Sequence, residues 1–369
     1  MPSAACACAA VWGTVSKSLL KIFLVLGAIL VGLVIGELLL RVVAHEIKPV
    51  ARGGTGLLFS SQSWELDTEG AVRYQPNREI RAIAVRYGQV AYDVRFHTNN
   101  LGFIDHRNYP SVRMTGRKYY AFVGDSFTAG YHGGEPWVPR LRDDLHRKGI
   151  EIYNLGIDGT GIEHFRRLLI SARHQLHLDA IVVLAISHDF QRGFWQPQFT
   201  DRQIAFCGEK AGKYKCNRIA GIVRPDVSRA EILDRISPED GELLTGWIRE
   251  LRLLTLVKRA SRNVSESFGQ KKKVLDQSLV SLQGLRAAFP KTEIHLIHLP
   301  EQDEVATGRY RLDIAKPVAE MGIEYFPALD RCVWSKDMFL EHDKHPNGRG
   351  YRHIARCVSD HLFSPAVRP

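Results

Sequence analysis

The stretch KYYAFVGDSFTAG, residues 118–130, decides the fold class. Its first part, 118–123, is a compact apolar run typical of a buried strand, and a glycine-bearing loop follows it. A helical pattern comes next, with Trp137, Leu141 and Leu145 on one face. The stretch therefore predicts a strand that passes through a tight loop into a helix, and the loop carries a serine.

The same alternation of strand and helix continues along the chain. We predict further strands at 150–155, 180–186, 293–299 and 323–326, and helices at 163–176, 272–289, 308–321 and from about 350. Strands that alternate with helices favour right-handed βαβ units. The sequence thus predicts an α/β fold with a flavodoxin-like doubly wound parallel sheet of about five strands, which binds ligands at the carboxyl ends of its strands.

Four polar segments lie where such a sheet would place a site. They are GDSFTAG at 124–130, NLGIDG at 154–159, SHD at 187–189 and DKHPN at 343–347. A serine on a tight strand-to-helix turn exposes its hydroxyl beside backbone N–H groups. It becomes a nucleophile when a histidine removes its proton and a carboxylate fixes the histidine tautomer. The pattern indicates nucleophilic catalysis, although a turn with a helix N-cap explains GDS alone equally well.

Together these segments resemble the SGNH, or GDSL, hydrolase superfamily, over about 118–362 apart from a long insert. The resemblance implies an esterase. No cofactor and no metal are expected, because the sequence has neither a convincing zinc-type Cys/His spacing nor a convincing nucleotide-binding glycine loop. The resemblance also implies roles for four residues: Ser126 as nucleophile and oxyanion-hole donor, His345 as general base, Asp343 as the carboxylate that orients it, and Gly159 as a second oxyanion-hole donor.

The third segment departs from the family pattern. The family usually has GxND, and its Asn amide completes the oxyanion hole, whereas this chain has Ser187-His188-Asp189. A neutral imidazole still has one N–H to donate, so His188 is the third candidate donor. The alternative is that His188 is an ordinary strand-end residue.

Residues 19–43, LLKIFLVLGAILVGLVIGELLLRVV, predict a transmembrane signal anchor behind a tail at 1–18. About 20 apolar residues span a bilayer, and roughly 22 are present if Glu37 lies near the interface. A buried core helix and a cleaved signal peptide are the alternatives. The long tail and the lack of a clear small-x-small cleavage site favour an uncleaved anchor. Basic residues flank both ends, so charge does not set the orientation.

Two regions accompany the predicted hydrolase domain at 118–369. Residues 53–117 predict a β-rich lead-in, with a short alternating run at 90–96. An insert at about 190–270 is expected to be helical, with helices at 228–236 and 241–259. The insert either forms a lid or substrate wall, or packs as a subdomain remote from the site.

Composition and cysteine usage bear on the compartment. An apolar content of 45% excludes a disordered chain, and the net charge of +10 suits an anionic polymer or membrane surface. Four cysteines follow the predicted span, and an oxidising compartment would allow the disulfides Cys207–Cys216 and Cys332–Cys357. Four free thiols in a cytosolic domain are the alternative.

These observations lead to one functional hypothesis with three alternatives. We predict a single-pass serine esterase in the inner (cytoplasmic) membrane, with its catalytic domain on the extracytoplasmic side. Its substrate would be an O-acyl ester, in first place acetyl, of an acylated carbohydrate such as an envelope or exported polysaccharide; no nucleic acid is expected. The alternatives are an O-acetyltransferase with the same triad, a non-catalytic glycan-binding module, and a lipid esterase at the membrane surface.

Overall fold

The computed structural model describes residues 6–43, 56–67, 70–86, 88–200, 203–210, 213–236, 252–253, 256, 268–341 and 343–364. Their contacts divide the chain into two units. The first contains the N-terminal helix together with residues 252–253 and 256, and the second contains all the other described residues.

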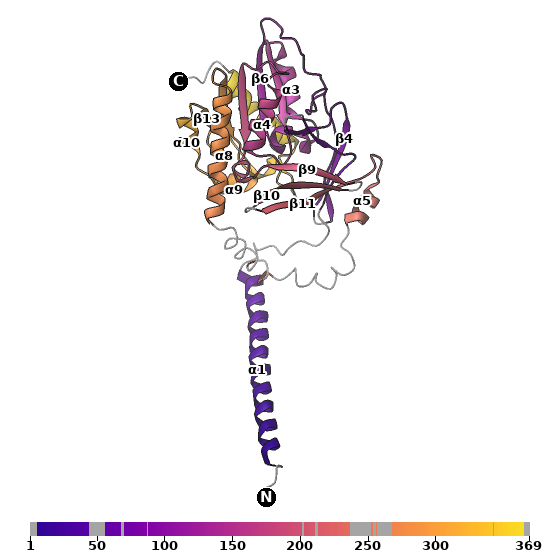
Figure 1. The fold of residues 1–369 in the computed structure, drawn as a ribbon, viewed down its shortest axis with the longest axis vertical. Helices are drawn as coiled ribbons and strands as arrows, with labels where there is room; N and C mark the ends of the chain where they lie inside the picture. The colour runs from indigo at the N-terminus through magenta and orange to yellow at the C-terminus, as the bar shows by residue number, and fades with distance from the viewer. Residues whose placement is uncertain are drawn as a thin grey trace. The chain divides into compact units, whose positions relative to one another are not determined.

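Five parallel strands form the main sheet of the second unit (Figure 1). Their order across the sheet is β13-β12-β8-β6-β7, where the strands are β6 (Lys118–Gly124), β7 (Ile150–Gly156), β8 (Ala180–Ala185), β12 (Glu293–His298) and β13 (Glu324–Pro327). Counted along the chain, this order is 2-1-3-4-5, which is that of a flavodoxin-like sheet. The predicted fold class is confirmed, and each strand lies within one residue of its predicted range.

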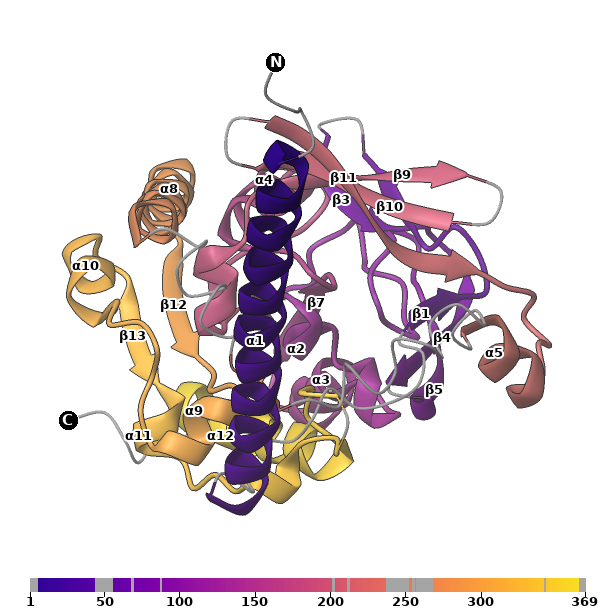
Figure 2. The ribbon, with the colours of Figure 1, turned by 90° about the horizontal axis from the view of Figure 1, so that it is seen from below.

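Helices cover both faces of this sheet (Figure 2). Alternate strand residues point to opposite faces, so Phe122 and Val182 pack with α3 (Trp137–His146) and α12 (Gly348–Phe363). The residues next to them in the same strands point to the other face and pack with α4 (Ile162–Ala172) and α8 (Phe268–Ala288). The remaining short helices of this domain are α2 (Ser126–Ala129), η1 (Tyr131–Gly133), η2 (Ser187–Gln191), α9 (Gln302–Thr307), α10 (Ala315–Glu320), α11 (Ala328–Arg331) and η4 (Lys336–Met338).

One predicted helix is wrong in extent. The range 308–321 was expected to be a single helix, but α9 ends at Thr307 and α10 begins only at Ala315. A turn separates them, and in it Tyr310 donates a hydrogen bond to the His298 carbonyl oxygen at 2.5 Å. That contact with β12 replaces the helical bonds that the sequence pattern predicts.

A second sheet combines the lead-in with the insert. Its order is β5-β4-β1-β11-β10-β9, and its strands are β1 (Gly56–Phe59), β4 (Glu79–Arg86), β5 (Gln89–His97), β9 (Trp195–Thr200), β10 (Gln203–Lys210) and β11 (Lys213–Ile222). A small hairpin of β2 (Trp64–Leu66) and β3 (Val72–Tyr74) accompanies it.

The expectation of a helical insert is therefore wrong for its first part. Strand β11 pairs in parallel with β1, and this pairing satisfies a strand edge that the lead-in alone would leave open. Ile204 on β10 and Ala220 on β11 are buried. Helix α5 (Arg229–Ile236) matches the helix predicted at 228–236. The helix predicted at 241–259 lies outside the described residues, except for 252–253 and 256, which are helical.

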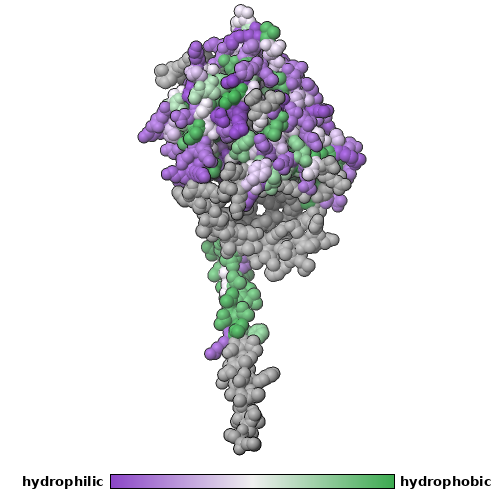
Figure 3. Space-filling view, viewed as in Figure 1, coloured by the Kyte–Doolittle hydropathy of each residue, from purple (hydrophilic) through white to green (hydrophobic). Residues whose placement is uncertain are grey.

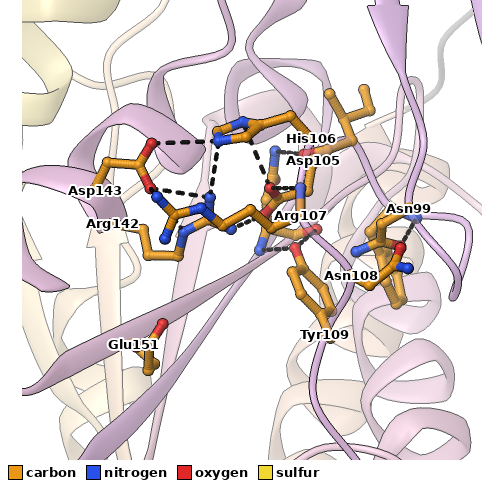
Figure 4. Close-up of polar contacts among 12 residues, drawn as sticks. Asn99, Asp105, His106, Arg107, Asn108, Tyr109, Arg142, Asp143 and Glu151 are labelled. Atoms are coloured by element: carbon orange, nitrogen blue, oxygen red, sulfur yellow. Dashed lines mark hydrogen bonds and ion pairs between the residues drawn. The ribbon is translucent and has the colours of Figure 1, made fainter.

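A buried ion pair fastens the segment that follows β5 to the main domain (Figure 4). Arg142 on α3 donates from Nη1 to Asp105 Oδ2 at 2.5 Å, and both side chains are almost completely buried. Nearby, the Asn154 backbone N–H donates to the Tyr109 hydroxyl at 2.7 Å, and the side-chain Nδ2 of Asn154 donates to the Ile104 carbonyl oxygen at 3.0 Å. The lead-in therefore holds the end of β7, where one of the polar segments begins.

The N-terminal helix α1 runs from Cys6 to Val43. Its part Lys21–Val43 has a mean hydropathy of 2.7, and it is the one helix among the described residues that is long and apolar enough to cross a membrane. Its described surface is hydrophobic (Figure 3). A signal sequence near the N-terminus would meet the same criteria of length and apolar composition.

Glu37 interrupts this apolar surface but has several partners. Its carboxylate accepts hydrogen bonds from the backbone N–H groups of Arg252 (3.1 Å) and Leu253 (3.0 Å) and from Arg41 Nε (2.9 Å). Arg252 Nη1 also donates to the carbonyl oxygen of Leu40 at 3.0 Å. The insert segment around Arg252 thus compensates the one acidic side chain of the apolar stretch and caps the carboxyl end of the helix.

We predict that Arg142→Ala lowers the free energy of unfolding by about 3–5 kcal/mol, because it leaves the buried Asp105 carboxylate without its partner. Denaturant unfolding of the detergent-solubilised full chain measures the loss. Arg140→Ala is the matched control, since Arg140 lies on the same helix and pairs with Glu135 at the surface; its loss should be about 1 kcal/mol or less. Equal losses in the two variants would show that the buried pair does not fasten the lead-in.

Candidate active site

The turn after β6 places Ser126 at the start of α2. The carboxylate of Asp125 caps this helix by accepting a hydrogen bond from the Phe127 backbone N–H at 2.8 Å. Gly124 is required just before it, because a Cβ there would lie 2.1 Å from Thr128 Oγ1 and 2.4 Å from the Leu184 carbonyl oxygen. The close approach of α2 to β8 thus fixes where Ser126 lies.

His345 reaches Ser126 from the loop before α12. Its Nε2 lies 2.9 Å from Ser126 Oγ, and its Nδ1 is hydrogen-bonded to Asp343 Oδ1. The Leu340 backbone N–H donates to the His345 carbonyl oxygen at 2.9 Å, and Asn347 caps α12 directly afterwards. The structure therefore brings Ser126, His345 and Asp343 together in the order that nucleophilic catalysis requires.

The carboxylate of Asp343 has a second partner that the sequence did not indicate. Arg86, at the end of β4 in the lead-in, places Nη2 3.0 Å from Asp343 Oδ2. Burial alone would raise the pKa of Asp343, but the hydrogen bond from His345 and the charges of His345 and Arg86 outweigh it and lower this pKa. Asp343 is therefore ionised when His345 becomes protonated.

A second imidazole lies flat against His345. The rings of His132 and His345 are 3.8 Å apart between centroids and nearly parallel, with 7° between their planes. His132 is buried, and burial together with the charges of His345 and Arg86 lowers its pKa well below the usual value. His132 is therefore neutral near pH 7 and limits the ring motion of His345 without adding a charge.

The loop after β7 carries Gly159 and a buried acid. Gly159 has a φ of 69°, a conformation that favours glycine, and its carbonyl oxygen accepts a hydrogen bond from Trp195 Nε1 at 2.8 Å. Burial raises the pKa of the neighbouring Asp158 to about 7, although the Tyr131 hydroxyl donates a hydrogen bond to its carboxylate. The indole of Trp195 thus holds the segment that the sequence assigned to the oxyanion hole.

His188 lies in η2, directly after β8. The residue is exposed, yet desolvation lowers the pKa of its imidazole to about 4, and the charge of Arg192 contributes. The ring is therefore neutral near pH 7 and has one N–H to donate. The neighbouring Asp189 is fully buried and accepts a hydrogen bond from the Ile186 backbone N–H at 3.0 Å.

Arg192 connects the ends of three strands. Its Nη1 donates to Asp125 Oδ2 at 2.7 Å, to Asp189 Oδ1 at 2.6 Å and to the Thr160 carbonyl oxygen at 2.9 Å. These acceptors follow β6, β8 and β7 respectively. Asp125 Oδ2 also accepts a hydrogen bond from Ser126 Oγ at 3.2 Å. Asp125 therefore links Arg192 to the serine. The sequence showed an arginine three residues after Asp189 but gave no sign of its contacts with Asp125 and Thr160.

A family model described as "GDSL-like Lipase/Acylhydrolase family" matches residues 122–353. This chain belongs to that family. Membership implies ester hydrolysis, and the predicted resemblance is confirmed. No curated protein matches the chain.

Several solved structures are similar to this GDSL-family chain at low identity. A lipase/acylhydrolase from Enterococcus faecalis is 10% identical, with a TM-score of 0.32 and coverage of 66% of this chain and 95% of that one. A catalytic mutant of an acetylxylan esterase from Geobacillus stearothermophilus is 12% identical, with a TM-score of 0.33 and coverage of 68% and 97%. A member of the lipolytic G-D-S-L family from Veillonella parvula is 14% identical, with a TM-score of 0.34 and coverage of 67% and 99%.

In this GDSL-family chain the insert begins beside the Gly159 loop. Trp195 and Phe206 stack with 3.9 Å between ring centroids, and both would lie 4.0 Å from a Cβ at Gly159. The start of the insert is therefore not remote from the site. Trp195 is buried, so it supports the loop from behind and presents little surface to a ligand.

Two disulfides lie in the domain. Cys207 and Cys216 are joined directly across β10 and β11, with 4.0 Å between their Cα atoms. Cys332, just after α11, is joined to Cys357 on α12, with 6.1 Å between Cα atoms. The second bond encloses the segment that carries Asp343 and His345.

Proposed function

We propose that this GDSL-family chain is a serine esterase that hydrolyses O-acyl esters, in first place acetyl esters, with Ser126, His345 and Asp343 as its triad. The observation that carries the proposal is the 2.9 Å separation of His345 Nε2 and Ser126 Oγ, while Nδ1 of the same ring bonds to Asp343. A hydroxyl with a base at this distance is an activated nucleophile.

The reaction follows from these positions. Ser126 Oγ attacks the ester carbonyl carbon as its proton passes to His345 Nε2, and Asp343 stabilises the imidazolium. His345 then donates that proton to the leaving alkoxide oxygen, which leaves an acyl-serine. Water attacks the acyl carbon while His345 takes its proton; the carboxylic acid departs and Ser126 regains its hydrogen.

Three N–H groups are proposed to bind the oxyanion that forms in both steps. They are the backbone N–H of Ser126, the backbone N–H of Gly159 and the imidazole N–H of His188. The neutral state that desolvation favours for His188 supports this role, because one ring nitrogen keeps its hydrogen and the other adds no charge.

The proposed substrate is an ester of a short acyl group that a carbohydrate polymer carries. Ser126 is only 4% exposed, and buried His132 stacks on the ring of His345 beside it, which favours an acyl group as small as acetyl. The net charge of +10 favours an anionic carrier such as an acylated envelope or exported polysaccharide. Transfer of the acyl group to a sugar hydroxyl uses the same acyl-serine and differs only in the acceptor.

We further propose that α1 anchors the chain in the inner membrane, with the domain on the extracytoplasmic side. The length and hydropathy of Lys21–Val43 support the anchor. The two disulfides support an oxidising compartment, because such bonds persist outside the cytoplasm.

Kinetics with 4-nitrophenyl esters test the triad. Ser126→Ala and His345→Ala should each lower kcat/KM for the acetate by about 10⁴-fold or more, and Asp343→Ala should be roughly 10- to 100-fold less damaging, because triad members act as a unit. Ser281→Ala, at a serine on α8, is the matched control and should keep wild-type activity.

The same assay separates the alternative functions. Acetate should be turned over faster than palmitate, whereas a lipid esterase would prefer palmitate and a binding module would turn over neither. An oligosaccharide acceptor that receives the acetyl group would identify a transferase. Wild-type activity in folded Ser126→Ala would refute the mechanism.

The histidine in the oxyanion hole makes a separate prediction. His188→Ala should lower kcat by roughly 10²–10³-fold, the usual cost of losing one oxyanion donor. His188→Asn should keep or raise the activity, because an amide is the donor common in this family. Steady-state kinetics with 4-nitrophenyl acetate measures both, and unchanged turnover in His188→Ala would exclude the side chain from the hole.

A further inference from the structure

Three potential metal ligands lie close together near the amino ends of β12 and β13, whereas the triad lies at the carboxyl ends of the strands. They are His295 on β12, Glu324 on β13 and His361 on α12, and one ligand atom from each lies within 4.8 Å of the others. His295 is paired with Val182 near the start of β8, and Glu324 is the first residue of β13. Ser126 follows the carboxyl end of β6, so the cluster is separate from the active site.

The two imidazoles present nitrogens that lack hydrogen-bond partners. His295 is 6% exposed, and among the described residues neither its Nδ1 nor the buried Nε2 of His361 has a partner with hydrogen-bond geometry. Both nitrogens face Glu324, with carboxylate oxygens 3.0 Å from His295 Nδ1 and 3.5 Å from His361 Nε2. Each nitrogen thus meets the carboxylate in an ion-pair contact that lacks hydrogen-bond geometry, and a cation bound among the three side chains would complete the arrangement.

Glu293 indicates which ligand fits. Its Oε1 lies 3.1 Å from His295 Nε2, so a neutral imidazole that donates its one N–H to Glu293 has only a lone pair at Nδ1. That lone pair and the Glu324 carboxylate then face each other as two acceptors. A cation between them resolves the conflict, and a carboxylate behind a histidine is the usual second partner of a metal-bound imidazole.

We propose that His295, Glu324 and His361 bind one divalent transition metal, with zinc first, and that Glu293 positions His295. Two imidazole nitrogens and one carboxylate oxygen form a zinc donor set, whereas magnesium and calcium prefer oxygen ligands alone. The Glu324 side chain is 55% exposed, which leaves room for a water as fourth ligand. Bonds of about 2.0–2.2 Å place the ligand atoms of a tetrahedral zinc about 3.4 Å apart, close to the 3.0 and 3.5 Å that separate the Glu324 oxygens from the two imidazole nitrogens.

The metal would act on the fold and not on the ester. Helix α12 begins at Gly348, just after His345, and His361 lies in its last turn. An ion shared with β12 and β13 would hold the carboxyl-terminal end of α12. The catalytic base His345 lies just before the amino-terminal end of the same helix. The Cys332–Cys357 disulfide holds the same helix between these two points.

Isothermal titration of the detergent-solubilised, EDTA-treated full chain with ZnCl₂ tests the proposal, with MgCl₂ as comparison. We expect one Zn²⁺ per chain and no response to Mg²⁺. His361→Ala and Glu324→Gln should both lose this binding. If His361→Ala fails to fold, Glu324→Gln alone tests the site. Glu293→Gln should weaken binding by about 10- to 100-fold. His174→Ala, at an exposed histidine, is the matched control and should bind as wild type.

Two results would overturn the proposal. Wild type that binds no Zn²⁺ would mean that a protonated His295, shared by Glu293 and Glu324, explains the cluster without a metal. Stoichiometric binding that persists in Glu324→Gln, together with loss of ester hydrolysis when wild type takes up Zn²⁺, would place the ion at the triad instead.

Discussion

One guanidinium nitrogen, Arg192 Nη1, holds together three of the loops that form the candidate active site. It lies within 3 Å of acceptors that follow β6, β7 and β8. Two of these are the fully buried carboxylates of Asp125 and Asp189, which would repel each other without the cation. Asp125 in turn caps α2 and contacts Ser126. The position of the serine therefore depends on an arginine that does not touch it.

The lead-in and the insert also act on the site, although neither carries a member of the triad. Arg86 from β4 pairs with Asp343, and Trp195 from β9 holds the Gly159 loop. Strands from these two regions form one sheet through the parallel pair of β1 and β11. Regions that are far apart in the sequence thus form a single layer, and that layer contacts both the carboxylate of the proposed triad and the loop of the proposed oxyanion hole.

The sequence predicted the features that depend on local pattern. Apolar runs such as 118–123 identified all five strands of the main sheet, and the GDSFTAG and DKHPN segments identified the residues that the structure brings together as Ser126, Asp343 and His345. The features that it missed depend on contacts between distant segments. Nothing near Arg86 in the chain indicates Asp343 as its partner, and nothing near Arg192 indicates its contact with Asp125. Nothing near β11 indicates β1 as its neighbour. The insert was expected to be helical because of the patterns at 228–236 and 241–259, and the pairing of its first part with β1 leaves no periodicity that identifies the partner strand.

The central claim is that Ser126 is a nucleophile activated by His345, and covalent labelling tests it most directly. A fluorophosphonate probe should modify the wild-type chain once, on the peptide that contains Ser126, as read by mass spectrometry after digestion. His345→Ala should slow this labelling strongly, because Ser126 would keep its proton. A label on another serine, such as the buried Ser187 beside His298, or an unchanged rate in His345→Ala, would contradict the account.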